Sequence, residues 1–108
     1  MIRILEATPE HISAVRERFR EYAAWLKVDL CFQGFERELA ELPGDYAVPR
    51  GRLLVACDGP HVVGCAALRP LAGWDCEMKR LYVIPACRGK GIARRLAGKL
   101  VSEKVLRL

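Results

Sequence analysis

The chain has 108 residues, of which 52% are hydrophobic and 29% charged. This length allows one domain with a modest core, and the composition argues against a disordered chain. No apolar run approaches the roughly 20 residues needed to cross a bilayer, and the N-terminus lacks the apolar segment of a signal peptide. We therefore expect a cytoplasmic protein without membrane contact.

The formal net charge of +5 is unevenly distributed along the chain. Basic residues crowd the C-terminal end, which suggests an anionic ligand near it. They are Arg88, Lys90, Arg94, Arg95, Lys99, Lys104 and Arg107.

Five cysteines form no Cys-x-x-Cys pair and fall mostly within apolar runs. This spacing favours buried free thiols in a reducing compartment over a disulfide frame or a metal site. The residues are Cys31, Cys57, Cys65, Cys76 and Cys87.

The first half of the chain predicts a strand and two helices. Ile2–Glu6 alternates apolar and polar residues, as a short strand does. Thr8 and Pro9 are typical of a helix N-cap and first turn, and apolar residues then recur at helical spacing from Ile12 to about Lys27. A second, shorter helix is expected over Phe32–Leu42, before a proline and a glycine.

The second half predicts a loop, three strands and a helix. Asp45–Gly51 is expected to be a loop, followed by strands Arg52–Cys57, Val62–Leu68 and Cys76–Ile84, the first two forming a hairpin. The third strand begins polar and becomes continuously apolar, which indicates burial on both faces at its far end. A helix from Ile92 carries two apolar rows at four-residue spacing. These rows are Ile92, Leu96 and Leu100, and Ala93, Ala97 and Val101.

The segment Arg88-Gly89-Lys90-Gly91-Ile92-Ala93 lies between the third strand and this helix. First-turn N–H groups of a helix lack partners within the helix, and the helix dipole favours negative charge there. Glycines allow the backbone to approach a phosphate closely, and the two basic side chains add positive charge. The segment predicts a diphosphate site, although a simple tight connection is the alternative.

Two common phosphate motifs do not fit these letters. A dinucleotide fingerprint needs a third glycine where Arg94 stands, and an acidic residue at the end of a later strand. A P-loop needs serine or threonine after Gly89-Lys90, where Gly91 stands.

The pattern that remains is Arg-x-x-Gly-x-Ala, formed by Arg88, Gly91 and Ala93. With the preceding strand, the block Glu77–Ala93 resembles the GNAT superfamily of N-acetyltransferases at its coenzyme A signature. The upstream order of a strand, two helices and a strand hairpin is similar too. The resemblance implies an α/β fold with a central mixed, mostly antiparallel sheet flanked by helices.

The resemblance also implies an acetyl-CoA site and acetyl transfer to a primary amine of an unidentified small molecule or peptide, by direct attack and without metal. Leu81 and Val83 would pair with the pantetheine arm, and a backbone N–H of their strand would polarise the thioester carbonyl. The cofactor-binding residues implied are Leu81, Tyr82, Val83, Arg88, Gly89, Lys90, Gly91, Ile92 and Ala93.

Glu77, at the start of the signature strand, is the candidate general base, and a solvated acid at a strand end is the alternative. Cys87 is not expected to act as a nucleophile because no histidine lies near it in sequence. Tyr22, Trp25 and Phe35 are expected either to line the acceptor channel or to pack in the core.

Members of this superfamily continue beyond the signature helix with further strands and another helix, which the resemblance implies are missing after Leu108. Three interpretations stay open: an incomplete enzyme, a short form completed by homodimerisation at the exposed sheet edge, or a non-catalytic coenzyme A-binding or protein-interaction remnant. A nucleic-acid-binding module is disfavoured because the basic helix face has no accompanying aromatic platform.

Overall fold

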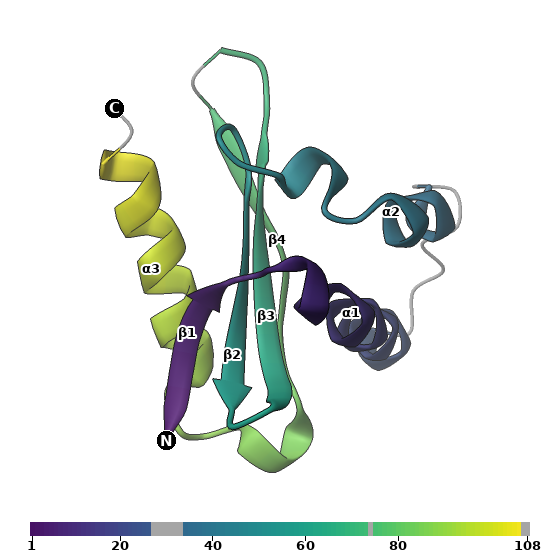
Figure 1. Ribbon diagram of the computed structural model, residues 1–108. Coiled ribbons are helices and arrows are strands. Elements are labelled where there is room, and N and C mark those ends of the chain that lie inside the picture. The colour runs from purple at the N-terminus through teal and green to yellow at the C-terminus, as the bar shows by residue number, and fades with distance from the viewer. Residues whose placement is uncertain (27–33, 74, 107–108) are drawn as a thin grey trace.

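The sheet has four antiparallel strands in the order β1-β2-β3-β4 (Figure 1). This computed structural model describes residues 1–26, 34–73 and 75–106. The strands are β1 Ile2–Glu6, β2 Arg52–Asp58, β3 His61–Pro70 and β4 Cys76–Val83. All four predicted strands are confirmed, and every neighbouring pair of the described sheet is antiparallel.

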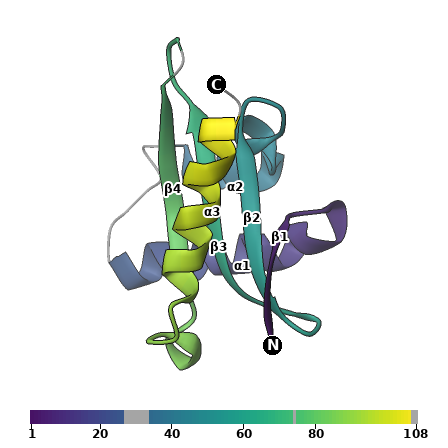
Figure 2. The ribbon, with the colours of Figure 1, turned by 90° about the vertical axis from the view of Figure 1, so that its left-hand side faces the viewer.

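Helices cover both faces of this sheet. Figure 1 shows α1 and α2 on one face and α3 on the other, and Figure 2 shows α3 lying along its face of the sheet. The helices are α1 Ile12–Leu26, α2 Phe35–Glu41 and α3 Ile92–Leu106. Their predicted order is confirmed. Lys27, where the first helix is expected to end, and Phe32, where the second is expected to begin, lie outside the described residues.

Short 3-10 turns join several of these elements. η1 (Pro9–His11) leads into α1 with Thr8 as its N-cap, as the sequence predicts. The Thr8 N–H donates to Nδ1 of His11 at 3.0 Å. η3 (Gly44–Tyr46) begins before the predicted loop and buries Tyr46 to 4% exposure, and η4 (Pro85–Cys87) follows β4.

Two hydrophobic clusters lie on opposite faces of the sheet. One joins α1 and α2 to the strands and includes Phe19, Leu39 and Val55. The other joins α3 to the strands and includes Leu54 and Leu96. Both strand faces are therefore buried in the middle of the sheet, which explains the continuous apolar runs of β2 and β3.

Of the two apolar rows that the sequence gives this helix, α3 buries one. Ile92, Leu96 and Leu100 are at most 2% exposed, whereas Ala93 is exposed and Val101 is 57% exposed. Successive helical residues differ by about 100° around the axis, so the row beginning at Ala93 turns away when the row beginning at Ile92 faces the sheet.

The expectation of buried thiols is only partly correct. Cys57 and Cys65 are buried free thiols, while Cys76 and Cys87 are free and half-buried. Cys31 lies outside the described residues. Among the described helices, none combines the length and apolar character needed to span a bilayer.

Candidate functional site

A β-bulge interrupts β4. The strand pairs Cys65 with Tyr82 and Ala67 with Lys79, so β4 has one residue more than β3 in this interval. Arg80 lies in the bulge with a φ of 59°, the only positive φ at a described residue other than glycine. A left-handed conformation costs a residue with a Cβ about 1–2 kcal/mol, so the surrounding contacts must hold it.

The strand after the bulge has a free edge. The N–H of Ile84 donates to the carbonyl of Val63 at 2.9 Å, so Ile84 faces β3. Peptide groups alternate in direction along a strand, which turns those of Val83 and Leu81 away from β3. β4 is the outermost strand of the described sheet on this side, so these groups face the free edge.

The turn after β4 relies on two left-handed glycines. Gly89 and Gly91 have φ values of +83° and +77°, which residues with a Cβ rarely adopt. The carbonyl of Gly91 accepts the bond from the N–H of Arg95 at 3.1 Å and so marks the start of α3. First-turn N–H groups of α3 therefore point toward the turn without partners in the helix.

A cleft of about 520 Å³ lies over this turn. A Cβ built on Gly89 or Gly91 would meet no atom within 4 Å, so these glycines leave open space. The lining residues are Val83, Cys87, Arg88, Gly89, Gly91, Ile92, Ala93 and Arg94. The space, the unpartnered N–H groups and the guanidinium groups together suit a phosphorylated anion.

Arg88 spans from the turn to the free edge. Its Nε donates to the carbonyl of Val83 at 2.8 Å. Its guanidinium carbon lies 4.8 Å from the ring centroid of Trp25 and 5.4 Å from that of Tyr82, distances that allow cation–π attraction. In this structure the Arg88 side chain therefore occupies the outward carbonyl of Val83, one of the hydrogen-bond acceptors at the free edge of β4.

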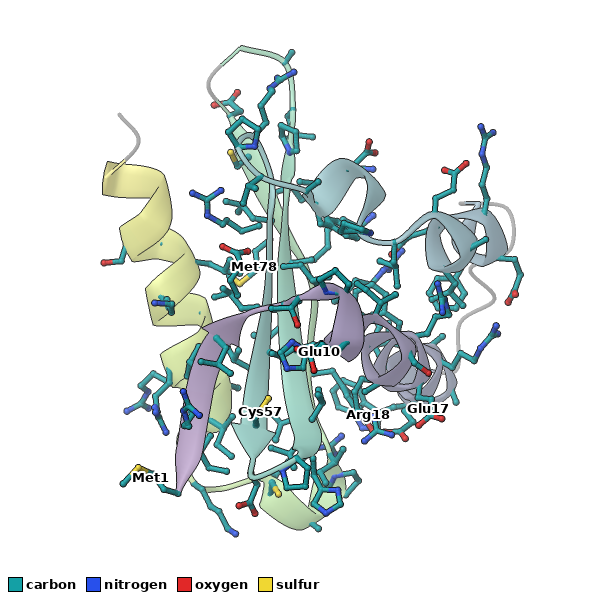
Figure 3. The ribbon with its side chains drawn as sticks, in the orientation of Figure 1. Met1, Glu10, Glu17, Arg18, Cys57 and Met78 are labelled. Atoms are coloured by element: carbon teal, nitrogen blue, oxygen red, sulfur yellow. The ribbon has the colours of Figure 1, made fainter. Side chains whose placement is uncertain are left out.

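Glu77 lies at the start of β4, directly opposite Arg69 of β3. The Arg69 guanidinium donates to the Glu77 carboxylate at 2.8 Å, and 44% of the Glu77 side chain is exposed. The next residue, Met78, projects to the α3 side (Figure 3), so strand alternation places Glu77 on the side of α1 and α2. Arg69 itself borders a second cavity of about 400 Å³ against α2 and η3.

An ion pair between the buried Arg80 and the half-buried Glu38 anchors the bulge from the α2 side. Arg80 is 4% exposed and donates from Nε and Nη2 to the two oxygens of Glu38 at 3.0 and 2.7 Å. The Tyr46 hydroxyl donates to the same carboxylate at 2.9 Å. The Cys65 thiol also donates to the carbonyl of Arg80 at 3.4 Å. Side chains from β3, α2 and η3 therefore converge on one bulge residue.

These contacts lower the pKa of Glu38 and raise the pKa values of Arg80 and Tyr46. Burial would raise the pKa of Glu38, but the hydrogen bonds and charge of Arg80, aided by Tyr46, outweigh it and lower that pKa. The pKa of Arg80 is raised despite burial because Glu38 stabilises its charge. Burial and the nearby Glu38 carboxylate raise the pKa of Tyr46. The pair is thus charged at neutral pH, with a neutral phenol beside it.

Aromatic side chains cover the same face of β4. The ring centroids of Tyr22, Trp25 and Tyr82 lie between 6.2 and 6.4 Å from one another. Trp25 is 55% exposed, whereas Phe35 is 5% exposed and belongs to the core. Of the two uses expected for these residues, core packing is confirmed for Phe35.

The bulged strand, its free edge and the glycine turn at the start of α3 form one continuous unit, and the chain that carries it matches a known protein family. The Acetyltransferase (GNAT) family matches residues 12–106. The chain belongs to this family. A curated relative, an uncharacterized N-acetyltransferase of Schizosaccharomyces pombe, is 37% identical over 101 residues, covering 90% of this chain and 62% of its own length.

Solved structures of acetyltransferases share this fold. An acetyltransferase of Staphylococcus aureus superposes with a TM-score of 0.84 at 19% identity, over 99% of this chain and 68% of that one. The PaiA N-acetyltransferase of Thermoplasma acidophilum, solved in complex with coenzyme A, gives 0.73 at 18% identity, over 99% and 74%. The chain spans less than two thirds of the length of the first curated relatives it matches.

The GNAT fold brings together most of the cofactor-binding residues expected from sequence. Val83, Arg88, Gly89, Gly91, Ile92 and Ala93 line the cleft over the turn. Leu81 lies on the free edge and Lys90 is exposed in the turn. Tyr82 instead pairs with Cys65 and packs in the core toward α1, and its role in cofactor binding stays a prediction.

Sequence reasoning missed three residues near this unit. Glu38 and Tyr46 reach the bulge from α2 and η3. In the sequence, the only indication of Glu38 is that a carboxylate lies on the apolar face of the second predicted helix. Arg94 lines the cleft, although its place in the first turn of α3 could have indicated this.

Proposed function

We propose that this GNAT protein transfers the acetyl group of acetyl-CoA to a primary amine by direct attack of the amine. The observation that carries the proposal is the continuity of three features. A free strand edge follows a bulge, leads into a turn with two left-handed glycines, and ends at the N-terminus of α3.

The glycine turn and the free edge of β4 would bind the cofactor. The N–H groups of residues 89 to 93 are assigned to the diphosphate, with Arg88 and Lys90 supplying positive charge. Support comes from the open space beside Gly91 and from the cleft of about 520 Å³. Val83 and Leu81 are assigned to the pantetheine arm, which would extend the sheet as an added strand.

The bulged strand would also take part in the transfer step. Acetyl-CoA supplies an activated thioester, and the Leu81 N–H, which faces the free edge just after the bulge, is assigned to its carbonyl oxygen. A donor placed there stabilises negative charge that develops on this oxygen. Glu77 is assigned as the base that accepts the amine proton, directly or through a water molecule. As the C–N bond forms, the C–S bond of the thioester breaks and coenzyme A leaves as a thiolate, which takes a proton from solvent. The ion pair with Arg69 holds the Glu77 carboxylate on the face of the sheet that α1 and α2 cover.

A second proposed use of the free edge is pairing with another copy of this chain. β4 ends the described sheet, and unpaired strand edges pair readily with other strands. The dimer and the pantetheine arm would use the same groups of Leu81 and Val83, so the two uses compete unless the second copy contributes elsewhere.

Titration of the protein with acetyl-CoA, with its mass and heat of binding followed, tests these alternatives. Saturable binding with turnover on a panel of amines supports the transferase. Binding without turnover on any amine supports a coenzyme A-binding protein instead. A protein that is folded by circular dichroism and binds neither acetyl-CoA nor coenzyme A would overturn the proposal.

A further inference from the structure

The Glu38 carboxylate has no place in the proposed chemistry, yet it accepts hydrogen bonds from two side chains of other elements. It accepts two hydrogen bonds from Arg80 and one from Tyr46, all at 3.0 Å or less. Fork-to-carboxylate contacts of this kind fix direction as well as distance. The contact therefore restrains the Arg80 side chain in one orientation.

The restrained residue also has the unusual backbone. Arg80 is the bulge residue with a φ of 59°, and such conformations persist only where the surroundings over-determine them. The guanidinium is further enclosed by aromatic rings, its carbon lying 5.3 Å from the centroid of Phe35 and 5.9 Å from that of Tyr22. The side chain is thus held on three sides while the backbone keeps its left-handed turn.

Arg80 controls the peptide group that matters most for the proposed transfer. The N–H of Leu81 belongs to the peptide unit between Arg80 and Leu81, so its direction follows directly from the φ and ψ of Arg80. A rotation of Arg80 toward ordinary strand geometry would remove the bulge and reverse the alternation of the peptides before Tyr82.

We propose that Glu38, supported by Tyr46, is a positioning residue that holds Arg80 in the bulge conformation and so aims the Leu81 N–H at the thioester carbonyl. This inference rests on the proposed acetyl transfer. It gives α2 a part in the reaction without contact between α2 and the reacting atoms. Glu38 and Tyr46 would set the rate of transfer, while the glycine turn would set the affinity for the cofactor.

The variant Glu38→Gln tests this proposal because it removes the charge while keeping the size of the side chain. We expect kcat to fall about 10²-fold, the magnitude typical of a misplaced carbonyl donor, with the Kd for coenzyme A unchanged. Glu41→Gln is the matched control, since Glu41 is an exposed carboxylate of α2 that pairs with Arg37 at 3.2 Å. It should leave both constants as in the wild type.

A spectroscopic measurement separates positioning from a general loss of stability. Infrared spectra of bound acetyl-CoA, labelled with carbon-13 at the thioester carbonyl, should show a lowered carbonyl frequency in the wild type and a return toward the free value in Glu38→Gln. Tyr46→Phe removes one hydrogen bond to Glu38 and keeps the ion pair, so the carbonyl frequency should return less far toward its free value. If Glu38→Gln does not fold, Tyr46→Phe tests the positioning role instead.

The outcomes distinguish the two proposals. A lowered frequency in the wild type that is retained in the folded variants would overturn the role of Glu38 and leave the transferase proposal standing. A wild-type carbonyl that binds without any shift would overturn both, because no donor would then be polarising it.

Discussion

Gly91→Glu is the sharpest test of the glycine turn. Gly91 has a φ of +77°, and a Cβ placed on it would meet no atom within 4 Å. The new side chain therefore enters the open space assigned to the diphosphate instead of clashing with the protein. The substitution therefore has one effect on folding and a separate effect on ligand binding.

The folding effect comes from the backbone. A residue with a Cβ in a left-handed conformation costs about 1–2 kcal/mol, and each 1 kcal/mol lowers Tm by about 4–8 °C in a domain of this size. The binding effect comes from charge: two like charges about 4 Å apart near a protein surface repel by about 4 kcal/mol. Since about 1.4 kcal/mol is a factor of ten, the Kd for coenzyme A should rise about 10³-fold.

Two further variants separate these effects in calorimetric titrations and thermal melts. Gly91→Ala carries the backbone cost without the charge, so it should lower Tm and change Kd much less. Gly98→Glu carries the charge without the site, because Gly98 lies exposed two turns into α3 with open space around it; it should bind coenzyme A normally. Folded Gly91→Glu protein with the wild-type Kd would refute the assignment of the turn.

Glycine substitutions, alkaline pH and a change at Glu77 test the packing, the buried thiol and the proposed base. Gly98→Ala should raise the free energy of unfolding by about 0.5–1 kcal/mol, while Gly64→Ala should lower it by about 1–3 kcal/mol because its Cβ would lie 3.1 Å from the backbone oxygen of Tyr82; changes of the same sign in urea unfolding would contradict this packing. Burial raises the pKa of Cys65 from 9.0 to about 12, so above pH 9 the unfolded thiol loses a proton that the folded one keeps. Stability present below pH 9 should therefore be lost toward pH 12 at about 1.4 kcal/mol per unit, and a Cys65→Ala variant with the same slope as the wild type would exclude this cause. Glu77→Gln should lower the acetylation rate about 10²-fold or more with the affinity for acetyl-CoA retained, and an unchanged rate would remove Glu77 from the mechanism.

The strands, the order of the helices and the glycine turn could be predicted because each has a local pattern. Alternation marks β1, the apolar runs mark β2 and β3, and the two glycines stand beside basic residues before a helical repeat. Thr8 likewise predicts the start of the first helix, because N-capping depends on only a few neighbouring residues.

The bulge could not be predicted in this way. Left-handed bulge residues are usually glycines, but this position holds Arg80, and the run from Cys76 to Ile84 looks like an uninterrupted strand. Its conformation depends on Glu38, 42 residues away in sequence. Only the folded chain brings the two together, so sequence patterns located the strand edge and missed what shapes it.

The contact between Arg88 and Val83 would let the proposed cofactor site distinguish ligands that carry phosphate from those that do not. The guanidinium that caps the Val83 carbonyl, at 2.8 Å from Nε, belongs to the residue assigned to the diphosphate. A ligand carrying phosphate would bind the Arg88 guanidinium, and this contact would at the same time release the Val83 carbonyl for pairing with the ligand. A short thioester without phosphate would face an edge still capped, so discrimination between them would begin before either reached the acceptor amine.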